Sequence, residues 1–319
     1  MYKFLCGGLL GLLLFFGNAR GQGGQLPAPL QIGVSMGITT ITPEKLAYAD
    51  SVGIDCINIS LNPLVNKNRQ LAFSPAAIHQ MVAKVKKATQ AADIHIAAFH
   101  MPFGQKMDLA LISESDRQAV IAVHRQLLDL CGTLHPDIVL FHPSWYLTVN
   151  QRDAHIRQLV QSAKDLLPAV EKTGGRMVIE NMTGPELQVT RKGVTYERPL
   201  LRTMEETVAI MAQMPPDVYA AVDMNHILHP EKLILALGKR LQFVHIADGD
   251  GAHERHYFPC SGKGMNDWMA IIDALYQAGY TGPFMYECHY KDLKDLVVCY
   301  NLLYNRYLNE KYIKPKYDQ

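Results

Sequence analysis

Short apolar runs alternate with longer amphipathic stretches through most of this 319-residue chain. The runs have the length of buried strands, and the stretches between them carry apolar residues three and four positions apart, as helices do. The predicted strands are Gln31–Met36, Cys56–Ser60, His95–His100, Ile138–His142, Arg176–Asn181, Val218–Asp223, Phe243–Asp248 and Pro283–Cys288. Eight parallel strands joined by helices close into a (β/α)8 barrel, which we expect as the fold.

Residues at the ends of the helical stretches support the same alternation. Thr42-Pro43 and Ser74-Pro75 each pair an N-cap residue with proline at the first helical position. Glycines that could end helices are Gly53, Gly132, Gly174 and Gly279. The predicted helices are Pro43–Val52, Pro75–Ala92, Glu114–Cys131, Ala154–Lys172, Thr203–Gln213, Pro230–Leu237, Met265–Ala278 and Leu293–Lys311.

The N-terminal segment differs from the rest of the chain. Residues 1–21 contain one lysine, an apolar run from Phe4 to Phe16, and then small residues. This pattern predicts a secretory signal peptide, because a run of about 13 is too short to span a bilayer; a membrane anchor is the alternative. We expect a leader at residues 22–30 and a single barrel domain at 31–319. The protein would be exported, periplasmic in a Gram-negative host, and free of the membrane after cleavage.

Charge and cysteine content narrow the function classes. The formal charge is +1, from 31 basic and 30 acidic residues, so the chain lacks the field that attracts nucleic acid. The segment after the signal contains an odd number of cysteines: Cys56, Cys131, Cys260, Cys288 and Cys299. At least one thiol is therefore free, and without a CxxC pair we expect neither structural zinc nor a disulfide framework. Cys56 and Cys288 lie inside predicted strands.

Acidic and imidazole side chains end four of the strands: Glu180, Asp223, His245 and Glu287. The C-terminal ends of barrel strands converge on the active site, so these residues are expected to meet there. Buried carboxylates need a cation, and oxygen and nitrogen ligands without thiolate suit one divalent ion, Mn²⁺, Zn²⁺, Mg²⁺ or Co²⁺. A single such residue would more often be a hydrogen-bonded core residue, but a whole series indicates a site.

Histidines follow the same pattern. His100 and His142 end two further strands, and His226 lies three positions after Asp223. Each could contact substrate, and His226 could instead bind a second metal.

Several motifs in series resemble the xylose isomerase-like barrel superfamily, which includes sugar isomerases, ketose epimerases, inositol-catabolic dehydratases and metal-dependent apurinic endonucleases. The motifs are IENM, VDMNHIL, VHIADGDG, SGKG followed by Trp268, and GYTGPFMYEC, and the resemblance runs from Gln31 to Tyr290. It implies that Glu180, Asp223, His245 and Glu287 bind one catalytic metal ion. As in the epimerase branch, Glu180 and Glu287 would also form the acid/base pair on opposite faces of the substrate.

The remaining histidines distinguish the branches. In the endonuclease branch, the positions of His100 and His142 bind a further metal, whereas in sugar-acting members such histidines contact hydroxyls, which we favour. The endonuclease pattern also has Asp-x-His after the seventh strand, where this chain has Glu254-Arg255-His256. We assign Arg255 and His256 to substrate binding, with a solvated loop charge as the alternative for Arg255. Trp145 would supply an apolar wall for a sugar ring, or simply pack.

These residues predict a metal-dependent sugar isomerase or epimerase that moves a proton next to a carbonyl of a free keto sugar or sugar derivative. The alternative is a lyase or hydratase acting on 3-keto-glycosides through the same enolisation. Two further hypotheses are a multinuclear-zinc phosphodiesterase of the endonuclease type and a noncatalytic sugar-binding barrel. The expected partner is a small sugar, and the sequence is compatible with a homo-oligomer.

Overall fold

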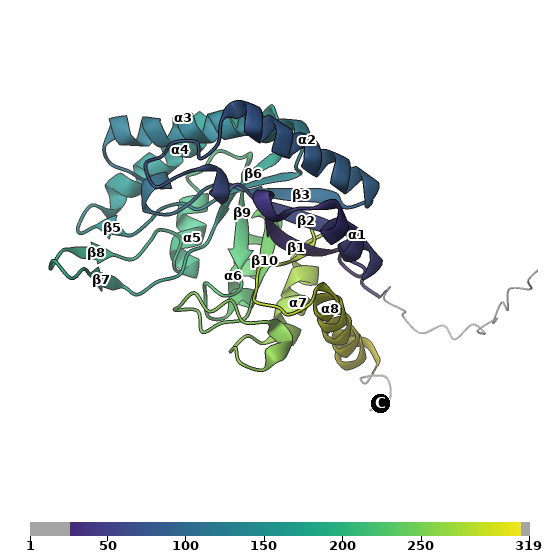
Figure 1. Ribbon diagram of the computed structural model, residues 1–319. Helices are drawn as coiled ribbons and strands as arrows, with labels where there is room; N and C mark the ends of the chain where they lie inside the picture. Colours follow the sequence, from purple (N-terminus) through teal and green to yellow (C-terminus); the bar gives the residue numbers. More distant parts are fainter. Residues whose placement is uncertain (1–25, 314–319) are drawn as a thin grey trace, which may run out of the picture.

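Eight parallel strands close into a barrel in the order β1-β11-β10-β9-β6-β4-β3-β2. Figure 1 shows this barrel in the computed structural model, which describes residues 26–313. The barrel strands are β1 (Ile32–Gly37), β2 (Cys56–Ser60), β3 (His95–His100), β4 (Ile138–Phe141), β6 (Arg176–Glu180), β9 (Val218–Asp223), β10 (Leu241–Ile246) and β11 (Phe284–Tyr286). The predicted (β/α)8 barrel is therefore confirmed, while the expected signal peptide lies outside the described residues.

Helices connect the strands and pack around the barrel (Figure 1). They are α1 (Pro43–Ser51), α2 (Pro75–Ala91), α3 (Glu114–Cys131), α4 (Arg152–Glu171), α5 (Met204–Met211), α6 (Pro230–Leu237), α7 (Trp268–Gln277) and α8 (Leu293–Leu308). Short 3-10 turns are η1 (Ile38–Thr40), η2 (Asn62–Leu64), η3 (Gln105–Met107), η4 (Gly132–Leu134), η5 (Gly238–Arg240) and η6 (Pro259–Ser261), and a π-helical turn, η7 (Asn309–Ile313), follows α8.

The predicted helix caps form with one exception. Thr42 Oγ1 accepts from the Lys45 amide, and Ser74 Oγ accepts from the Ala77 amide. Gly174 adopts a positive φ of 85°, the backbone conformation that a glycine stop uses. Gly132 was expected to act in the same way, but its φ is −59° because the chain continues into η4.

A small antiparallel sheet, ordered β5-β8-β7, lies beside the barrel and was not predicted. Its strands are β5 (Leu147–Thr148), β7 (Leu187–Val189) and β8 (Thr195–Glu197), seen at the left of Figure 1. They follow β4 and β6, so the sheet extends the C-terminal end of the barrel. Leu187 and Val189 are 58% and 64% exposed, which removes the alternation of buried and exposed residues that identifies a strand.

A disulfide joins Cys260 in η6 to Cys299 in α8, with their Cα atoms 5.8 Å apart. From the sequence we expect no disulfide framework, and this bond corrects that expectation. The two cysteines are separated by 39 positions, and only the folding of the loop after β10 against α8 brings them together. Cys56, Cys131 and Cys288 are free thiols, as the odd number required. Cys288 lies just beyond β11 rather than inside a strand.

Among residues 26–313, none of the helices combines the length and apolar character that crossing a membrane requires.

Candidate metal centre

Side-chain alternation along the barrel strands places the candidate site residues above an apolar plug. The interior plug includes Ala98, Leu140, Val178, Ala221, Phe243 and Met285. Each of these lies two positions before one of His100, His142, Glu180, Asp223, His245 and Glu287. Because residues two apart point to the same side of a strand, the six polar side chains also face the barrel axis, one layer nearer its C-terminal mouth.

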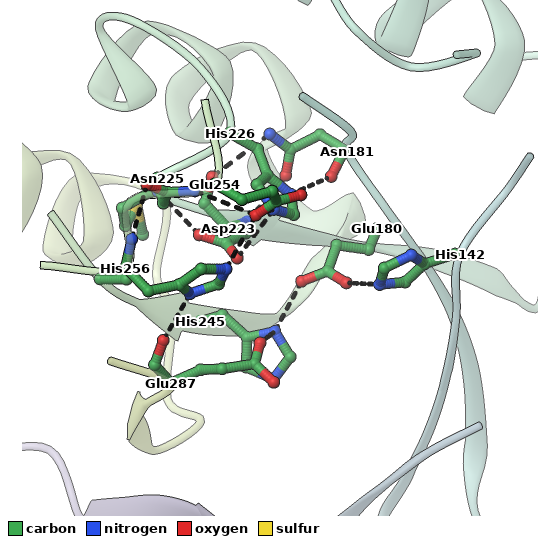
Figure 2. A network of polar contacts seen from close by, with 12 residues as sticks. His142, Glu180, Asn181, Asp223, Asn225, His226, His245, Glu254, His256 and Glu287 are labelled. Atoms are coloured by element: carbon green, nitrogen blue, oxygen red, sulfur yellow. Dashed lines mark hydrogen bonds and ion pairs between the residues drawn. The ribbon is translucent and has the colours of Figure 1, made fainter. Parts of the chain in front are cut away.

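Four of these residues form the central cluster: Glu180, Asp223, His245 and Glu287. One potential ligand atom from each lies within 4.8 Å of those of the other three. His245 Nδ1 is 2.6 Å from Glu180 Oε1 and 2.7 Å from Glu287 Oε2, a geometry visible in Figure 2. Glu180, Asp223 and His245 are fully buried, whereas the Glu287 side chain is 27% exposed and faces the mouth. The structure thus brings together the four residues predicted as metal ligands.

The charges within the central cluster strongly affect one another. Burial opposes ionisation of Glu287, but His245 outweighs it and lowers the pKa of this carboxyl to about 2. Burial likewise disfavours a charged His245, yet Glu287 and Glu180 hold its pKa well above the ordinary value. For Asp223 burial dominates and raises the pKa. A concentration of buried carboxylates around one imidazole is costly unless positive charge is present among them.

The donor atoms fit a divalent cation. Glu180 Oε2 and Asp223 Oδ2 are buried and accept no well-formed hydrogen bond from the described residues. Three carboxylates and one imidazole are ligand types that Zn²⁺ and Mn²⁺ accept at bond lengths of about 2.0–2.2 Å. Ligand atoms held within 4.8 Å of one another can surround one such ion with small movements. The cluster could therefore hold a single cation.

A second group flanks the cluster on the β3 and β4 side. His142 Nε2 lies 3.0 Å from Glu180 Oε2, and His100 Nε2 lies 3.7 Å from the same oxygen. Burial lowers the pKa of His100 to about 4, so this imidazole is neutral. Phe103 stacks on the His142 ring at a centroid distance of 4.4 Å. His142 is thus held between an aromatic ring and a site carboxylate, where a substrate hydroxyl could reach it.

A third group flanks the cluster on the opposite side, around Glu254. Its Oε2 atom lies 3.1 Å from His226 Nε2 and 2.8 Å from His256 Nε2, and Figure 2 shows both rings turned toward this carboxylate. His226 Nε2 is also 3.4 Å from Asp223 Oδ2. Burial opposes the charged form of His226, but Asp223 and Glu254 raise its pKa to about 10. This chain has Glu254 and His256 where the endonuclease pattern has Asp-x-His, and the two residues form one cluster with His226.

The loop after β10 is fixed by Asp248. Its carboxylate accepts hydrogen bonds from the Trp268 indole nitrogen and from the backbone N–H of Asn266. A Cβ atom at Gly264 would collide with the Asp248 carboxyl group, so only glycine allows this close approach. These contacts join the motif VHIADGDG, which contains Asp248, to the motif SGKG, which contains Gly264, and to Trp268. It secures the base of the loop that carries Glu254 and His256.

A cavity of about 380 Å³ opens beside Glu287 and His256. Its other lining residues include Ser35, Ser60, His289 and Tyr290, which offer hydroxyl and ring nitrogen groups. Pockets of about 300–1,000 Å³ commonly bind small molecules.

Two residues predicted to bind substrate, Arg255 and Trp145, lie outside the central cluster. The Arg255 side chain is 44% exposed, and its Nε lies 3.4 Å from Asp250 on the same loop. Trp145 is 36% exposed and packs edge-on against Tyr146 between β4 and β5.

Three buried asparagines support the site and were not predicted. Asn181 Oδ1 accepts from the Asp223 amide, and Asn225 Oδ1 accepts from the amides of Arg255 and His256. Asn58, inside β2, lies 3.1 Å from His245 Nε2. A polar residue at an inward-facing position of an apolar strand was the available signal for Asn58, in the run CINIS.

Solved sugar epimerases share this fold. Against 3-keto-D-glucoside 4-epimerase YcjR from E. coli, the TM-score is 0.63 at 16% identity, covering 86% of this chain and 99% of the other. The D-allulose 3-epimerase from Methylomonas sp. gives 0.62 at 18% identity, with 88% and 99% covered. The D-psicose 3-epimerase from Clostridium cellulolyticum H10 gives 0.65 at 15% identity, again with 88% and 99% covered.

Sequence comparison identifies the family. No curated protein sequence matches the chain. The profile of the xylose isomerase-like TIM barrel family matches residues 46–301, which is most of the chain. The protein therefore belongs to the xylose isomerase-like TIM barrel family.

Proposed function

We propose that this protein is a metal-dependent sugar epimerase or isomerase that moves a proton next to a carbonyl group. The observation that carries this proposal is the position of Glu180 and Glu287. Their carboxylates meet at His245 but come from β6 and β11, which β9 and β10 separate in the barrel. A substrate between them would have a carboxylate on each side, the arrangement that removing and returning a proton on opposite faces requires.

The cluster also suits the charge change of this reaction. A divalent cation bound there would polarise a ketone oxygen and stabilise the negative charge that develops when the adjacent carbon loses its proton. Glu287, whose pKa is lowered to about 2, is ionised at neutral pH and faces the cavity, so it is available as a base. His142 and His256 would bind hydroxyl groups on either side. His226 and Glu254 would hold His256 in place.

The substrate we propose is a free ketose or a 3-keto-glycoside. The similar structures are a 3-keto-D-glucoside epimerase and epimerases of D-allulose and D-psicose, which supports a keto sugar. The same proton removal could expel a leaving group from a 3-keto-glycoside, so a lyase or hydratase is the variant of this proposal.

We also propose export of the protein, to the periplasm in a Gram-negative host. Disulfides persist in oxidising compartments, and the Cys260–Cys299 bond supports such a location. The apolar N-terminal run of the sequence agrees with it.

The test is a substrate screen with Mn²⁺ present, following free ketoses and 3-keto-glucosides by NMR. An epimerised product supports the epimerase, and an eliminated or hydrated product supports the lyase variant. Glu287→Gln should abolish turnover. Glu171→Gln is the matched control. Glu171 is the last residue of α4, shortly before β6 begins, so its carboxylate lies at the end of the barrel opposite the site. No turnover of any keto sugar by metal-loaded protein would overturn the proposal.

A multinuclear phosphodiesterase is the second candidate, and one observation favours it. Besides the central cluster, the groups His100–His142–Glu180 and Asp223–His226–His256 each bring potential metal ligands within 4.8 Å. Metal content per chain separates the two functions. One ion per chain supports the sugar enzyme, whereas two or three ions together with cleavage of a phosphodiester would support the hydrolase.

A further inference from the structure

His245 is held on every side, and each contact restricts its chemistry. Its Nδ1 atom faces the carboxylates of Glu180 and Glu287. One face of the ring stacks on His100 with an interplanar angle of 8°, and Phe243 packs edge-on against it. The remaining nitrogen, Nε2, faces the side chain of Asn58 on β2. These contacts set the direction of the ring, with Nδ1 toward the carboxylates and Nε2 toward Asn58.

Asn58 is fully buried and has few partners. Its Nδ2 atom lies 2.7 Å from Ser35 Oγ and 3.1 Å from His245 Nε2. Its Oδ1 atom has no hydrogen-bond partner among residues 26–313. An amide nitrogen only donates, so this orientation of the amide fits only a neutral imidazole that carries its proton on Nδ1 and accepts at Nε2. The charged imidazole that Glu180 and Glu287 favour carries hydrogen on both nitrogens and would also need an acceptor at Asn58.

A cation at Nδ1 likewise requires hydrogen on Nε2. A metal-bound imidazole is neutral and keeps its one proton on the second nitrogen, here Nε2. Nε2–H would then face Nδ2, and two donors would oppose each other. The two ends of an asparagine amide have nearly the same shape, so rotation by half a turn places Oδ1 at this position. One carbonyl oxygen can accept from both His245 Nε2–H and Ser35 Oγ–H.

We propose that Asn58 is the positioning residue of the metal centre, and that its Oδ1 accepts from His245 Nε2–H when Nδ1 binds the cation. Among residues 26–313, one end of the amide lacks a partner in either orientation. Ser35 Oγ can donate or accept, so the hydrogen on His245 Nε2 decides between the two orientations. Asn58 would fix the tautomer and the direction of the ring. The inference rests on the proposed function, because it requires a cation in the central cluster.

The direct test observes the wild-type protein. Protein labelled with ¹⁵N-histidine and loaded with Mg²⁺ or Zn²⁺ should show His245 with hydrogen on Nε2, the signal being assigned by its loss in His245→Gln. Hydrogen-free Nε2 in the loaded protein would overturn the proposal. If calorimetry finds no ion bound to wild-type protein at all, the proposed function fails as well, so the two failures are distinguishable.

Variants test the role through metal affinity rather than activity. Asn58→Asp supplies only acceptors and should bind Mn²⁺ at least as tightly as wild type. Asn58→Leu removes the acceptor at similar size and should weaken binding about 10–100-fold, as losing the hydrogen-bond partner of a metal-bound histidine does. Ser35→Ala, the control, should change affinity far less than Asn58→Leu. Equal losses in Asn58→Asp and Asn58→Leu, or an unchanged affinity in Asn58→Leu, would contradict the proposal.

Discussion

Glu180 Oε1 lies 2.6 Å from His245 Nδ1, although the two residues are 65 positions apart and β9 separates their strands in the barrel. This contact marks the centre of the site, because two more carboxylates join it: Asp223 at the end of β9, between the two strands, and Glu287 after β11, next to β10. A cluster of this kind gives up stability in exchange for ligand binding. Its properties can be tested through stability, binding and catalysis.

Asp223→Asn should separate stability from metal binding. Removing a buried carboxylate whose Oδ2 accepts no hydrogen bond from the described part of the chain relieves repulsion, so the metal-free variant should be at least as stable as metal-free wild type. Wild type should gain about 2.7 kcal/mol at a metal concentration of 100 times Kd, and the variant should lose most of this gain. Thermal melts with and without Mn²⁺ measure both effects. Equal metal-induced stabilisation of variant and wild type would rule out Asp223 as a ligand.

The Cys260–Cys299 bond should contribute strongly to stability. Closing a loop of 39 residues restricts the unfolded chain, which corresponds to about 4 kcal/mol in the chain-entropy estimate. The Cys260→Ser/Cys299→Ser double variant should lose free energy of unfolding of this order in urea titrations. A reducing agent should destabilise wild type and leave the double variant unchanged. Equal responses of the two proteins to reduction would show that the bond does not form in solution.

His124 should make the fold sensitive to acid. Burial lowers its pKa from 6.5 to about 3, so the folded protein binds fewer protons than the unfolded chain between these values. Its effect is absent above pH 6.5 and destabilises the fold progressively as the pH falls toward 3. Between pH 7 and pH 5 the loss should be about 2 kcal/mol. His124→Leu should reduce the pH 7 to pH 5 difference in unfolding free energy by this amount, and an unchanged difference would refute the assignment.

Trp145 should affect substrate binding more than turnover. Its partly exposed ring lies after β4, packs on Tyr146 and is not part of the central cluster, so we expect it to contact the sugar ring rather than the reacting carbon. Trp145→Ala should raise KM about tenfold with kcat little changed, because only uniform binding is lost. Trp145→Phe should retain most of the affinity. A fall in kcat at constant KM would place Trp145 in the reaction itself.

Much of the barrel was predictable, because strands in a parallel barrel are short and almost wholly apolar. The predicted bounds of β2, β3 and β9 match the structure. The prediction for β10 began and ended two residues late, since Asp248 leaves the barrel to pair with Tyr257. The small sheet was missed because β5 is only two residues long, β7 is exposed throughout and β8 is uniformly half-buried, so none of them shows the alternation of a strand.

The central cluster was also predictable, because each ligand ends an apolar run and barrel closure brings such ends together. Contacts that depend on how loops fold were not. The Cys260–Cys299 pair and the meeting of Glu254 with His226 arise from the path of the loop after β10. Asn58 was missed because a single polar residue within a strand does not reveal its partner.

In the proposed reaction, Glu180 and Glu287 exchange a proton with the carbon next to a carbonyl group. Deuterium incorporation from D₂O into D-allulose or a 3-keto-glucoside, with Mn²⁺ present, measures this step directly. Wild type and Glu171→Gln should incorporate deuterium at that carbon, whereas Glu180→Gln and Glu287→Gln should each lose at least about 100-fold in rate, the lower range for a general acid or base. Undiminished incorporation by either glutamine variant would show that the carboxylate it lacks does not move the proton.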